Sequence, residues 1–132
     1  AKHAGRAMIE AGNGGSIINL GSMYSRYGPP RAVGYASAKA GILGLSRALA
    51  VELAPHGIRS NAILPGWFDT ELTQQARQQI TGLNERVLSR IAAGRWATPD
   101  DMAGTAVWLA SRASDYVTGI AVSVDGGYSA ML

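Results

Sequence analysis

The sequence predicts an α/β fold in which a few buried parallel strands are covered by helices. Three short apolar runs rich in β-branched residues, 16–20, 59–64 and 120–124, have the length and composition of buried strands. Segments of helical character lie before and between them. Strands that alternate with helices form a parallel sheet with helices on its faces. Such a sheet usually has five or more strands, so three are few.

The predicted helices follow from periodicity and from their end signals. Residues 2–11 end at Gly12, and residues 34–54 carry a stripe of Ile42, Leu45, Leu49 and Leu53. Many other residues of 34–54 are Ala or Gly, which predicts close packing against a sheet or another helix. Residues 70–94 are predicted as two helical pieces divided near Gly82. Residues 98–111 begin with Thr98 as N-cap, Pro99 at the first helical position and two acids.

Composition restricts the classes of function. The 132 residues are enough for one domain, with 47% hydrophobic and 16% charged residues, as in packed globular proteins. The sequence has no cysteine, which excludes disulfides and thiolate metal sites and fits a cytoplasmic location. The net charge is +3, but the arginines are scattered, which argues against nucleic acid as a partner. We expect no membrane span and no metal site.

The strongest chemical signal is Tyr35 and Lys39, which lie one turn apart on one face of a predicted helix. A phenol has an ordinary pKa of about 10, and a nearby ammonium group lowers the pKa of a phenol. Such a pair can act as a general acid for ketone reduction and as a base for alcohol oxidation. Ser22 follows the carboxyl end of the first predicted strand, where open α/β sheets bind ligands. Its hydroxyl can hold a substrate oxygen.

Four motifs in order resemble the short-chain dehydrogenase/reductase family. Ile17–Ser22 followed by Tyr35–Gly41 resembles the Ser-Tyr-Lys core of that family, and Gly57–Thr70 resembles its Pro-Gly strand end. The later helix is matched by Arg95–Asp101 with Trp108–Ser111. The last strand and its turn are matched by Tyr116–Gly119 with Val124–Gly127. The resemblance implies the C-terminal part of a Rossmann-like, doubly wound parallel sheet and an NAD- or NADP-dependent oxidoreductase.

The resemblance also implies roles for particular residues. Tyr35 would be the proton donor or acceptor, Lys39 would bind the nicotinamide ribose and activate the tyrosine, and Ser22 would orient the substrate. Pro65, Gly66, Phe68 and Thr70 would contact the nicotinamide end of the cofactor, and Tyr35 would also adjoin it. Trp67 is either a wall of the substrate pocket or a core residue, and the same holds for Phe68. Trp96 and Trp108 are interpreted as packing residues.

Other parts of the family pattern are not found in the sequence. The glycine-rich turn of the form Gly-x-x-x-Gly-x-Gly is missing, because Gly12-Asn13-Gly14-Gly15 has another spacing and follows a helix. The family's catalytic asparagine would lie before Ala1. We therefore expect residues 1–132 to be one partial domain, the catalytic half, without the N-terminal half that binds the dinucleotide. The helix from Tyr35 to Ala54 and the last helix and strand resemble the surfaces through which family members form dimers and tetramers.

Two other functions are weighed against the oxidoreductase. One is a catalytically inactive remnant that uses the same fold to bind a partner, because fold does not settle function. The other is a serine hydrolase, which the missing Gly-x-Ser-x-Gly elbow argues against. The segment Pro65–Leu72 looks most like members that act on sugar acids such as gluconate, or on 3-oxoacyl thioesters.

The missing phosphate-binding turn leads to a testable expectation. Residues 1–132 expressed alone should bind NAD and NADP weakly or not at all, because nothing in them cradles the pyrophosphate. Fluorescence titration of NADH and NADPH against the purified 132-residue chain checks this. A dissociation constant in the low micromolar range would contradict it.

Overall fold

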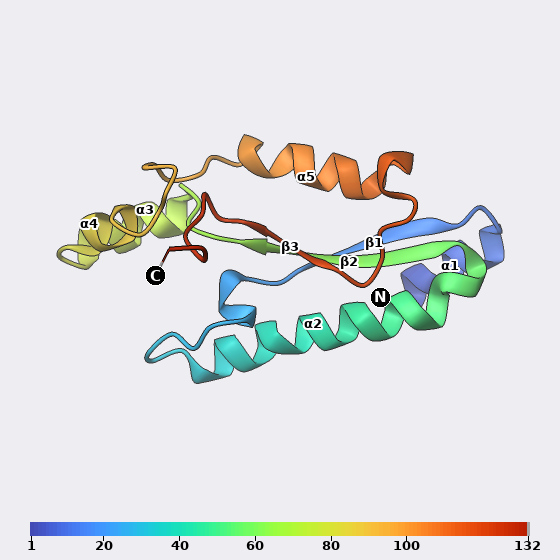
Figure 1. Ribbon diagram of the computed structural model, residues 1–132. Helices are drawn as coiled ribbons and strands as arrows, with labels where there is room; N and C mark the ends of the chain where they lie inside the picture. Colours follow the sequence, from blue (N-terminus) through green and yellow to red (C-terminus); the bar gives the residue numbers. More distant parts are fainter. Residues whose placement is uncertain (132) are drawn as a thin grey trace.

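The computed structural model of the chain describes residues 1–131. Its centre is a parallel sheet of three strands in the order β1 (Gly15–Leu20), β2 (Ile58–Pro65) and β3 (Ala121–Val124). Figure 1 shows the strands side by side, with helices above and below them. The predicted α/β architecture is confirmed, and each strand differs from its predicted range by no more than one residue at either end.

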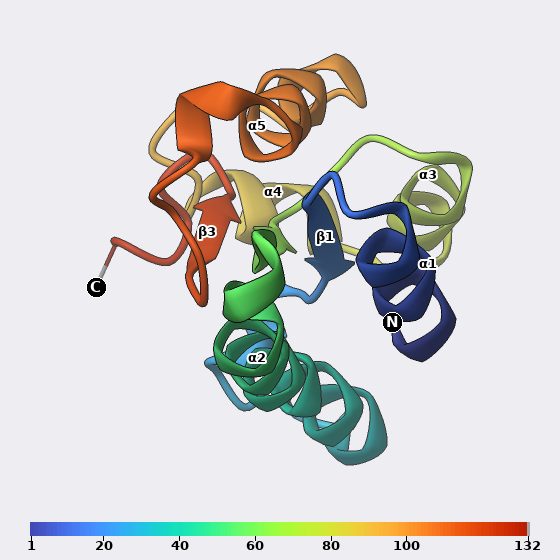
Figure 2. The ribbon, with the colours of Figure 1, turned by 90° about the vertical axis from the view of Figure 1, so that its right-hand side faces the viewer.

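Helices cover both faces of the sheet. Helix α5 (Asp100–Ala110) lies on one face, and α2 (Val33–Leu53) lies on the other, as the view along the sheet shows (Figure 2). Helix α1 (Lys2–Ala11) lies beside α2, where an added Cβ on Gly5 would be 3.3 Å from the Leu53 side chain. Short 3-10 turns at Met23–Ser25, Ala54–His56 and Arg112–Ser114 connect these elements.

The polar segment after β2 forms two short helices, as predicted, but they are shorter than the sequence indicates. Helix α3 (Glu71–Gln79) begins at a capping box in which the Thr70 side chain accepts from the Thr73 backbone, and α4 covers Leu83–Leu88. Gly82 separates them in the left-handed backbone conformation, with φ of 72°. Residues 89–94 are not helical, because the chain there turns to bring Ile91 into a buried cluster.

The inward face of α2 follows the predicted stripe only in part. Leu53 is buried and Leu49 packs against the same core cluster, whereas Leu45 is exposed and Ser46 and Ala50 are the other buried residues. The Ser46 hydroxyl accepts a hydrogen bond from the Asn19 amide of β1 at 3.0 Å. The glycines Gly34, Gly41 and Gly44 do not pack against the sheet: an added Cβ on any of them would meet no other atom within 4 Å among the described residues.

The beginning of α5 is stabilised in a way that the sequence only partly predicts. Pro99 has a helical backbone, but the helix begins at Asp100, and the Thr98 hydroxyl donates to Asp101 at 3.1 Å instead of accepting from a backbone N–H. The Asp101 carboxylate also accepts two hydrogen bonds from Arg95 and one from the Thr98 backbone, each of 2.7 Å. These bonds fix the loop before α5 to its first turn.

Two strand ends meet closely at the carboxyl edge of the sheet. The Gly66 N–H donates to the Val124 carbonyl at 2.9 Å, and an added Cβ on Gly66 would lie 2.6 Å from both Cα and Cβ of Asp125. The chain after Gly66 is held by Ala97, whose N–H donates to Trp67 and whose carbonyl accepts from Asp69. Only glycine permits this approach, so the position of the loop after β2 depends on it.

Replacing Gly66 by Ala should separate the two strand ends and reduce the free energy of unfolding by about 1–3 kcal/mol, as overpacking does. Gly104→Ala is the matched control, because an added Cβ there meets nothing within 4 Å on helix α5 and alanine favours a helix. Urea denaturation of the two variants and the parent protein checks this. Equal urea midpoints for the parent and Gly66→Ala would show that the close contact of Gly66 with Asp125 does not require glycine.

The contribution of Asp101 to the stability of the fold depends on pH. The bonds from Arg95, followed by that from the Thr98 backbone, lower the pKa of Asp101 below its ordinary value. A carboxyl with a lowered folded-state pKa contributes stability above its unfolded pKa of about 4 and loses it as the pH falls through the folded value. Asp101→Asn should therefore lower the thermal midpoint at neutral pH, with the difference shrinking as the pH drops below about 4. Asp100→Asn, one residue earlier, is the control, and a pH-independent difference for Asp101→Asn would contradict the assignment.

Candidate active site

Ser22, Tyr35 and Lys39 lie in one corner at the carboxyl end of β1. Ser22 is buried at the start of the 3-10 turn Met23–Ser25, and its hydroxyl oxygen accepts from the Tyr24 N–H at 3.1 Å. Ser25 joins this turn to α2: its hydroxyl accepts from the Ser22 N–H at 3.1 Å and donates to the Lys39 carbonyl at 2.7 Å. The two segments that carry the predicted residues are therefore tied together by one buried serine.

Tyr35 and Lys39 occupy one face of α2 at its first turns. The Lys39 ammonium nitrogen lies 5.9 Å from the centre of the Tyr35 ring and donates to the Leu20 carbonyl at 3.0 Å, at the last residue of β1. An ammonium group has three donors, so others stay available for a ligand. The Tyr35 side chain is half exposed, and its ring meets the Tyr24 ring edge to face with centres 6.4 Å apart.

Tyr24 was not singled out by the sequence, and it connects the corner to a cluster of aromatic rings. Its ring lies 6.5 Å from Trp67, which in turn lies 5.5 Å from Trp96 and 6.3 Å from Tyr128, all with steep interplanar angles. Burial raises the pKa of Tyr24. The nearby Tyr128 and Tyr35 raise the same pKa further, and the positive charge of Arg90 lowers it. The Tyr24 phenol therefore stays protonated near neutral pH and serves as a neutral hydroxyl. Its place directly after Ser22, past a strand end, is the sequence signal that could have identified it.

The aromatic cluster carries a guanidinium group at each of two places. Arg77 stacks on Trp96 with 4.4 Å between its guanidinium carbon and the ring centre, and it is paired with Asp69. Arg90 stacks on Tyr128 at 4.5 Å. Within residues 1–131, no carboxylate lies within 4 Å of the Arg90 guanidinium. No pattern in the sequence indicated Arg90, because Tyr128 reaches it only through the fold.

The residues after β2 separate into two groups. Pro65, Gly66, Phe68 and Thr70 line a hollow of about 390 Å³, together with Thr73, Pro99 and Met102. Trp67 instead belongs to the aromatic cluster. Its indole N–H is buried and lacks a hydrogen-bond partner among the described residues, so Trp67 is at once packed and adjacent to Tyr24. The structure thus keeps the predicted nicotinamide-contacting residues together and places Trp67 beside the corner.

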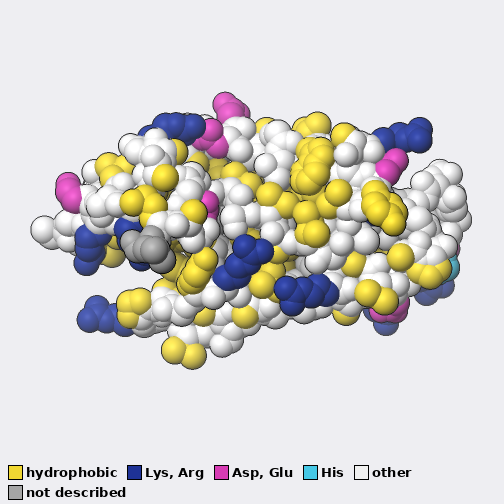
Figure 3. Space-filling model, viewed as in Figure 1, with side chains coloured by type: hydrophobic (Ala, Val, Ile, Leu, Met, Phe, Trp, Pro, Cys, Tyr) yellow, Lys and Arg dark blue, Asp and Glu magenta, His cyan; other side chains and the backbone are white. Residues whose placement is uncertain are grey.

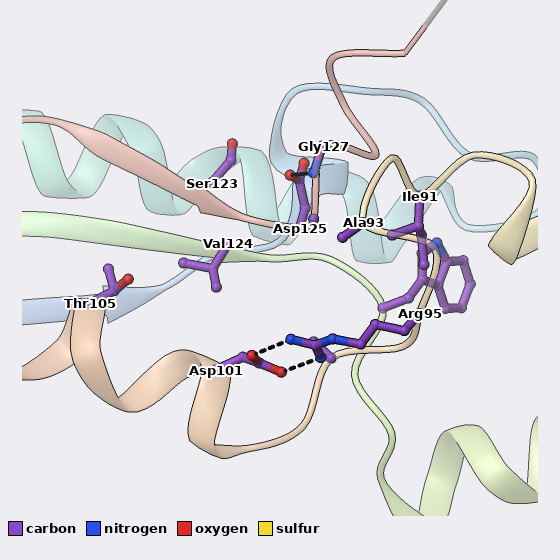
Figure 4. A pocket seen from close by; sticks show the side chains of 12 residues that line it. Ile91, Ala93, Arg95, Asp101, Thr105, Ser123, Val124, Asp125 and Gly127 are labelled. Carbon is purple, nitrogen blue, oxygen red and sulfur yellow. Dashed lines mark hydrogen bonds and ion pairs between the residues drawn. The ribbon is translucent and has the colours of Figure 1, made fainter.

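Another hollow, of about 330 Å³, lies between α5, β3 and the turn after β3 (Figure 4). Its charged residues are satisfied within the chain: Arg95 makes a two-pronged pair with Asp101, and Asp125 accepts from the Gly127 and Ser129 N–H groups. None of Ser22, Tyr35 and Lys39 lines it. This hollow therefore has a structural explanation and is not the candidate site.

Metal sites and membrane-spanning helices were searched for among residues 1–131. Residues 1–131 contain no group of three or more His, Asp or Glu side chains placed to hold a metal ion. No helix among them combines the length and apolar character that crossing a membrane requires. On the face drawn in Figure 3, Lys and Arg side chains are separated by apolar and uncharged surface.

Comparisons with known proteins show which family the chain belongs to. The family model described as enoyl-(acyl carrier protein) reductase matches residues 1–129. The chain is 47% identical over 127 residues to 2-dehydro-3-deoxy-D-gluconate 5-dehydrogenase of Escherichia coli K12, covering 96% of this chain and 50% of that protein. It is 40% identical over 124 residues to mouse (3R)-3-hydroxyacyl-CoA dehydrogenase, covering 94% and 47%.

Solved structures give the same result. A gluconate 5-dehydrogenase from Burkholderia cenocepacia J2315, in complex with NADP and tartrate, superposes with a TM-score of 0.90 at 36% identity, covering 96% of this chain and 49% of that one. A short-chain type dehydrogenase/reductase from Mycobacterium marinum gives 0.88 at 37%, covering 97% and 50%. The chain spans about half the length of the relatives it matches. It belongs to the family that the enoyl-(acyl carrier protein) reductase model describes, the short-chain dehydrogenases/reductases.

Proposed function

We propose that this chain is the catalytic half of an NAD(P)-dependent oxidoreductase that interconverts a secondary alcohol and a ketone. The observation that supports this best is the meeting of Ser22, Tyr35 and Lys39 in one corner at the carboxyl end of β1. A phenol hydroxyl beside an ammonium group, next to a second hydroxyl, is suited to moving a proton on or off a carbonyl oxygen.

Each of the three side chains has a separate task in this proposal. Tyr35 holds the proton at its phenol oxygen, gives it to the ketone oxygen in reduction and takes it from the alcohol in oxidation. Ser22 accepts from the Tyr24 N–H, so its own O–H is left to donate to the same substrate oxygen. Lys39 keeps a positive charge beside the Tyr35 ring and has N–H groups left for the ribose hydroxyls of the cofactor.

The residues after β2 fit the nicotinamide end of the cofactor. The hollow lined by Pro65, Gly66, Phe68 and Thr70 combines apolar walls with the hydroxyls of Thr70 and Thr73. A nicotinamide held by these residues would supply the hydride chemistry, and Tyr35 would hold and move the proton. The cofactor is NAD or NADP, and the Burkholderia relative, which contains NADP, favours NADP.

We propose a sugar acid as the substrate. The Escherichia coli and Burkholderia relatives are both named for oxidation of gluconate-type acids. A 3-oxoacyl thioester is the alternative, supported by the mouse relative at lower identity. Assays with D-gluconate, 2-dehydro-3-deoxy-D-gluconate and acetoacetyl-CoA distinguish the two classes.

We further propose that the protein forms a homo-oligomer, either a dimer or a tetramer. The face of α2 that carries Gly34, Gly41 and Gly44 is free in the described structure, and Val51 on the same helix is exposed. Small residues allow the close approach of a second helix. Sedimentation of the purified protein tests this proposal.

Tyr35→Phe in the complete enzyme should reduce turnover by roughly 10²–10⁴-fold, the usual contribution of a general acid–base group. Cofactor binding should persist, because Lys39 and the loop after β2 are unchanged. Initial rates and NADPH titration measure the two effects, and Tyr116→Phe, which alters a fully exposed tyrosine, is the control. Near-full turnover in Tyr35→Phe would refute the role of Tyr35. A parent protein that turns over no substrate in either direction would favour the binding remnant.

A further inference from the structure

A hollow of about 480 Å³ adjoins the proton-transfer corner. It is lined by the turn after Ser22, by the proline-rich loop before α2, by the second residue after α4 and by the C-terminal segment; Met23, Tyr24, Tyr27, Arg90, Tyr128 and Met131 are among its lining residues. Figure 3 shows it at the left, between the beginning of α2 and the C-terminal segment. Its volume suits a small-molecule ligand.

The hollow is next to Tyr35 and is held in shape by bonds within the chain. Tyr24 forms one wall, and its ring meets the Tyr35 ring. The Tyr27 hydroxyl donates to the Ser129 carbonyl at 3.2 Å, which joins the loop before α2 to the C-terminal segment. Arg26 donates to the Ala121 carbonyl at 2.9 Å, which ties the same loop to β3. These bonds fix the walls of the hollow, and the Tyr24 wall is the one that contacts Tyr35.

Arg90 is the charged residue that lines this hollow; its side chain is exposed, and the backbone on either side of it is anchored by buried residues. Val87 and Ile91, on either side of it in the chain, are buried together with Trp96, and Tyr128 packs against the same cluster. The guanidinium lies on the Tyr128 ring with 4.5 Å between the guanidinium carbon and the ring centre. Stacking uses the face of a guanidinium and leaves the N–H groups at its edge able to donate.

The charge of Arg90 contrasts with that of its neighbours. Arg77 and Arg95 are paired with Asp69 and Asp101, whereas no carboxylate of residues 1–131 lies within 4 Å of Arg90. A guanidinium fork binds a carboxylate through two parallel hydrogen bonds. Arg90 is stacked on an aromatic wall in a hollow next to the reacting corner, with no carboxylate partner among residues 1–131, and is therefore arranged for an anionic ligand.

We propose that Arg90, stacked on Tyr128, binds the carboxylate of the substrate and so selects sugar acids over uncharged sugars. This proposal rests on the function proposed above and adds a residue that determines specificity. Tyr24 also lines the hollow, and its hydroxyl offers a neutral donor or acceptor to the sugar between the carboxylate and Tyr35.

The test uses the complete enzyme and the variant Arg90→Gln, which keeps a long polar side chain but removes the charge. Arg86→Gln, one turn earlier and also exposed, is the matched control because Arg86 does not line the hollow. The kinetic parameters kcat and KM are measured with D-gluconate and with D-gluconamide, its uncharged analogue. Arg90→Gln should raise KM for gluconate on the order of 10- to 100-fold, as loss of a charge-assisted pair does, with little change for gluconamide.

A binding measurement separates this proposal from the proposed activity. Calorimetry of D-gluconate with the enzyme saturated by NADPH, which cannot accept hydride, reports carboxylate binding without turnover. The parent and Arg86→Gln should bind equally, and Arg90→Gln should bind on the order of 10- to 100-fold more weakly. Equal gluconate affinity in Arg90→Gln and the parent overturns the role of Arg90 even if the enzyme is active. Gluconate binding that depends on Arg90, in an enzyme that oxidises no sugar acid, supports the role of Arg90 and refutes sugar acids as the substrate class.

Discussion

The pairing of β2 on both of its edges is the constraint on which the rest of the structure depends. Residues 60–64 are buried one after another, so each polar group there needs a partner inside the protein. The Asn61 side chain donates to the Val117 carbonyl and accepts from the Ile120 N–H, and Ser60 N–H donates to the Thr118 hydroxyl. These bonds fix the entry to β3, and the ladder then carries the Pro65–Phe68 segment to one defined place beside the turn at Asp125.

The sequence predicted the strands well, because a short apolar run between turn residues has few other uses in a folded chain. It predicted the inward face of α2 only in part. Leu53 is buried as expected and Leu49 packs against the same cluster, but Leu45 is exposed, and the buried Ser46 accepts a hydrogen bond from Asn19. A partner on another element, far away in the chain, cannot be read from local spacing. Arg59 is a similar case: it appeared as one more scattered cation, yet it donates to the Leu109 and Ser111 carbonyls at the end of α5.

The candidate site divides in the same way. Ser22, Tyr35 and Lys39 follow from one strand end and one helical turn, so the sequence could indicate them. Their roles stay predictions, whereas their common location is a property of the structure. The proposed carboxylate site, Tyr24, Arg90 and Tyr128, comes from three separate segments that the aromatic cluster and the stacking of Arg90 on Tyr128 bring together. Contacts of that kind depend on the tertiary fold.

The residues proposed for proton transfer and the residue proposed for substrate selection lie on separate segments of the chain. The proposed proton chemistry lies just after β1 and on the first turns of α2, and these segments are linked by Ser25 and by the Lys39 bond to the Leu20 carbonyl. Arg90 lies on the segment after α4, which is held by the buried cluster of Val87, Ile91 and Trp96 and by the hydrogen bond from the Ala93 N–H to the Gly126 carbonyl. Replacing Arg90 leaves every hydrogen bond of the corner in place, because none of those bonds involves it. Substrate charge can thus be selected independently of the proton transfer, which is how one fold serves many substrates.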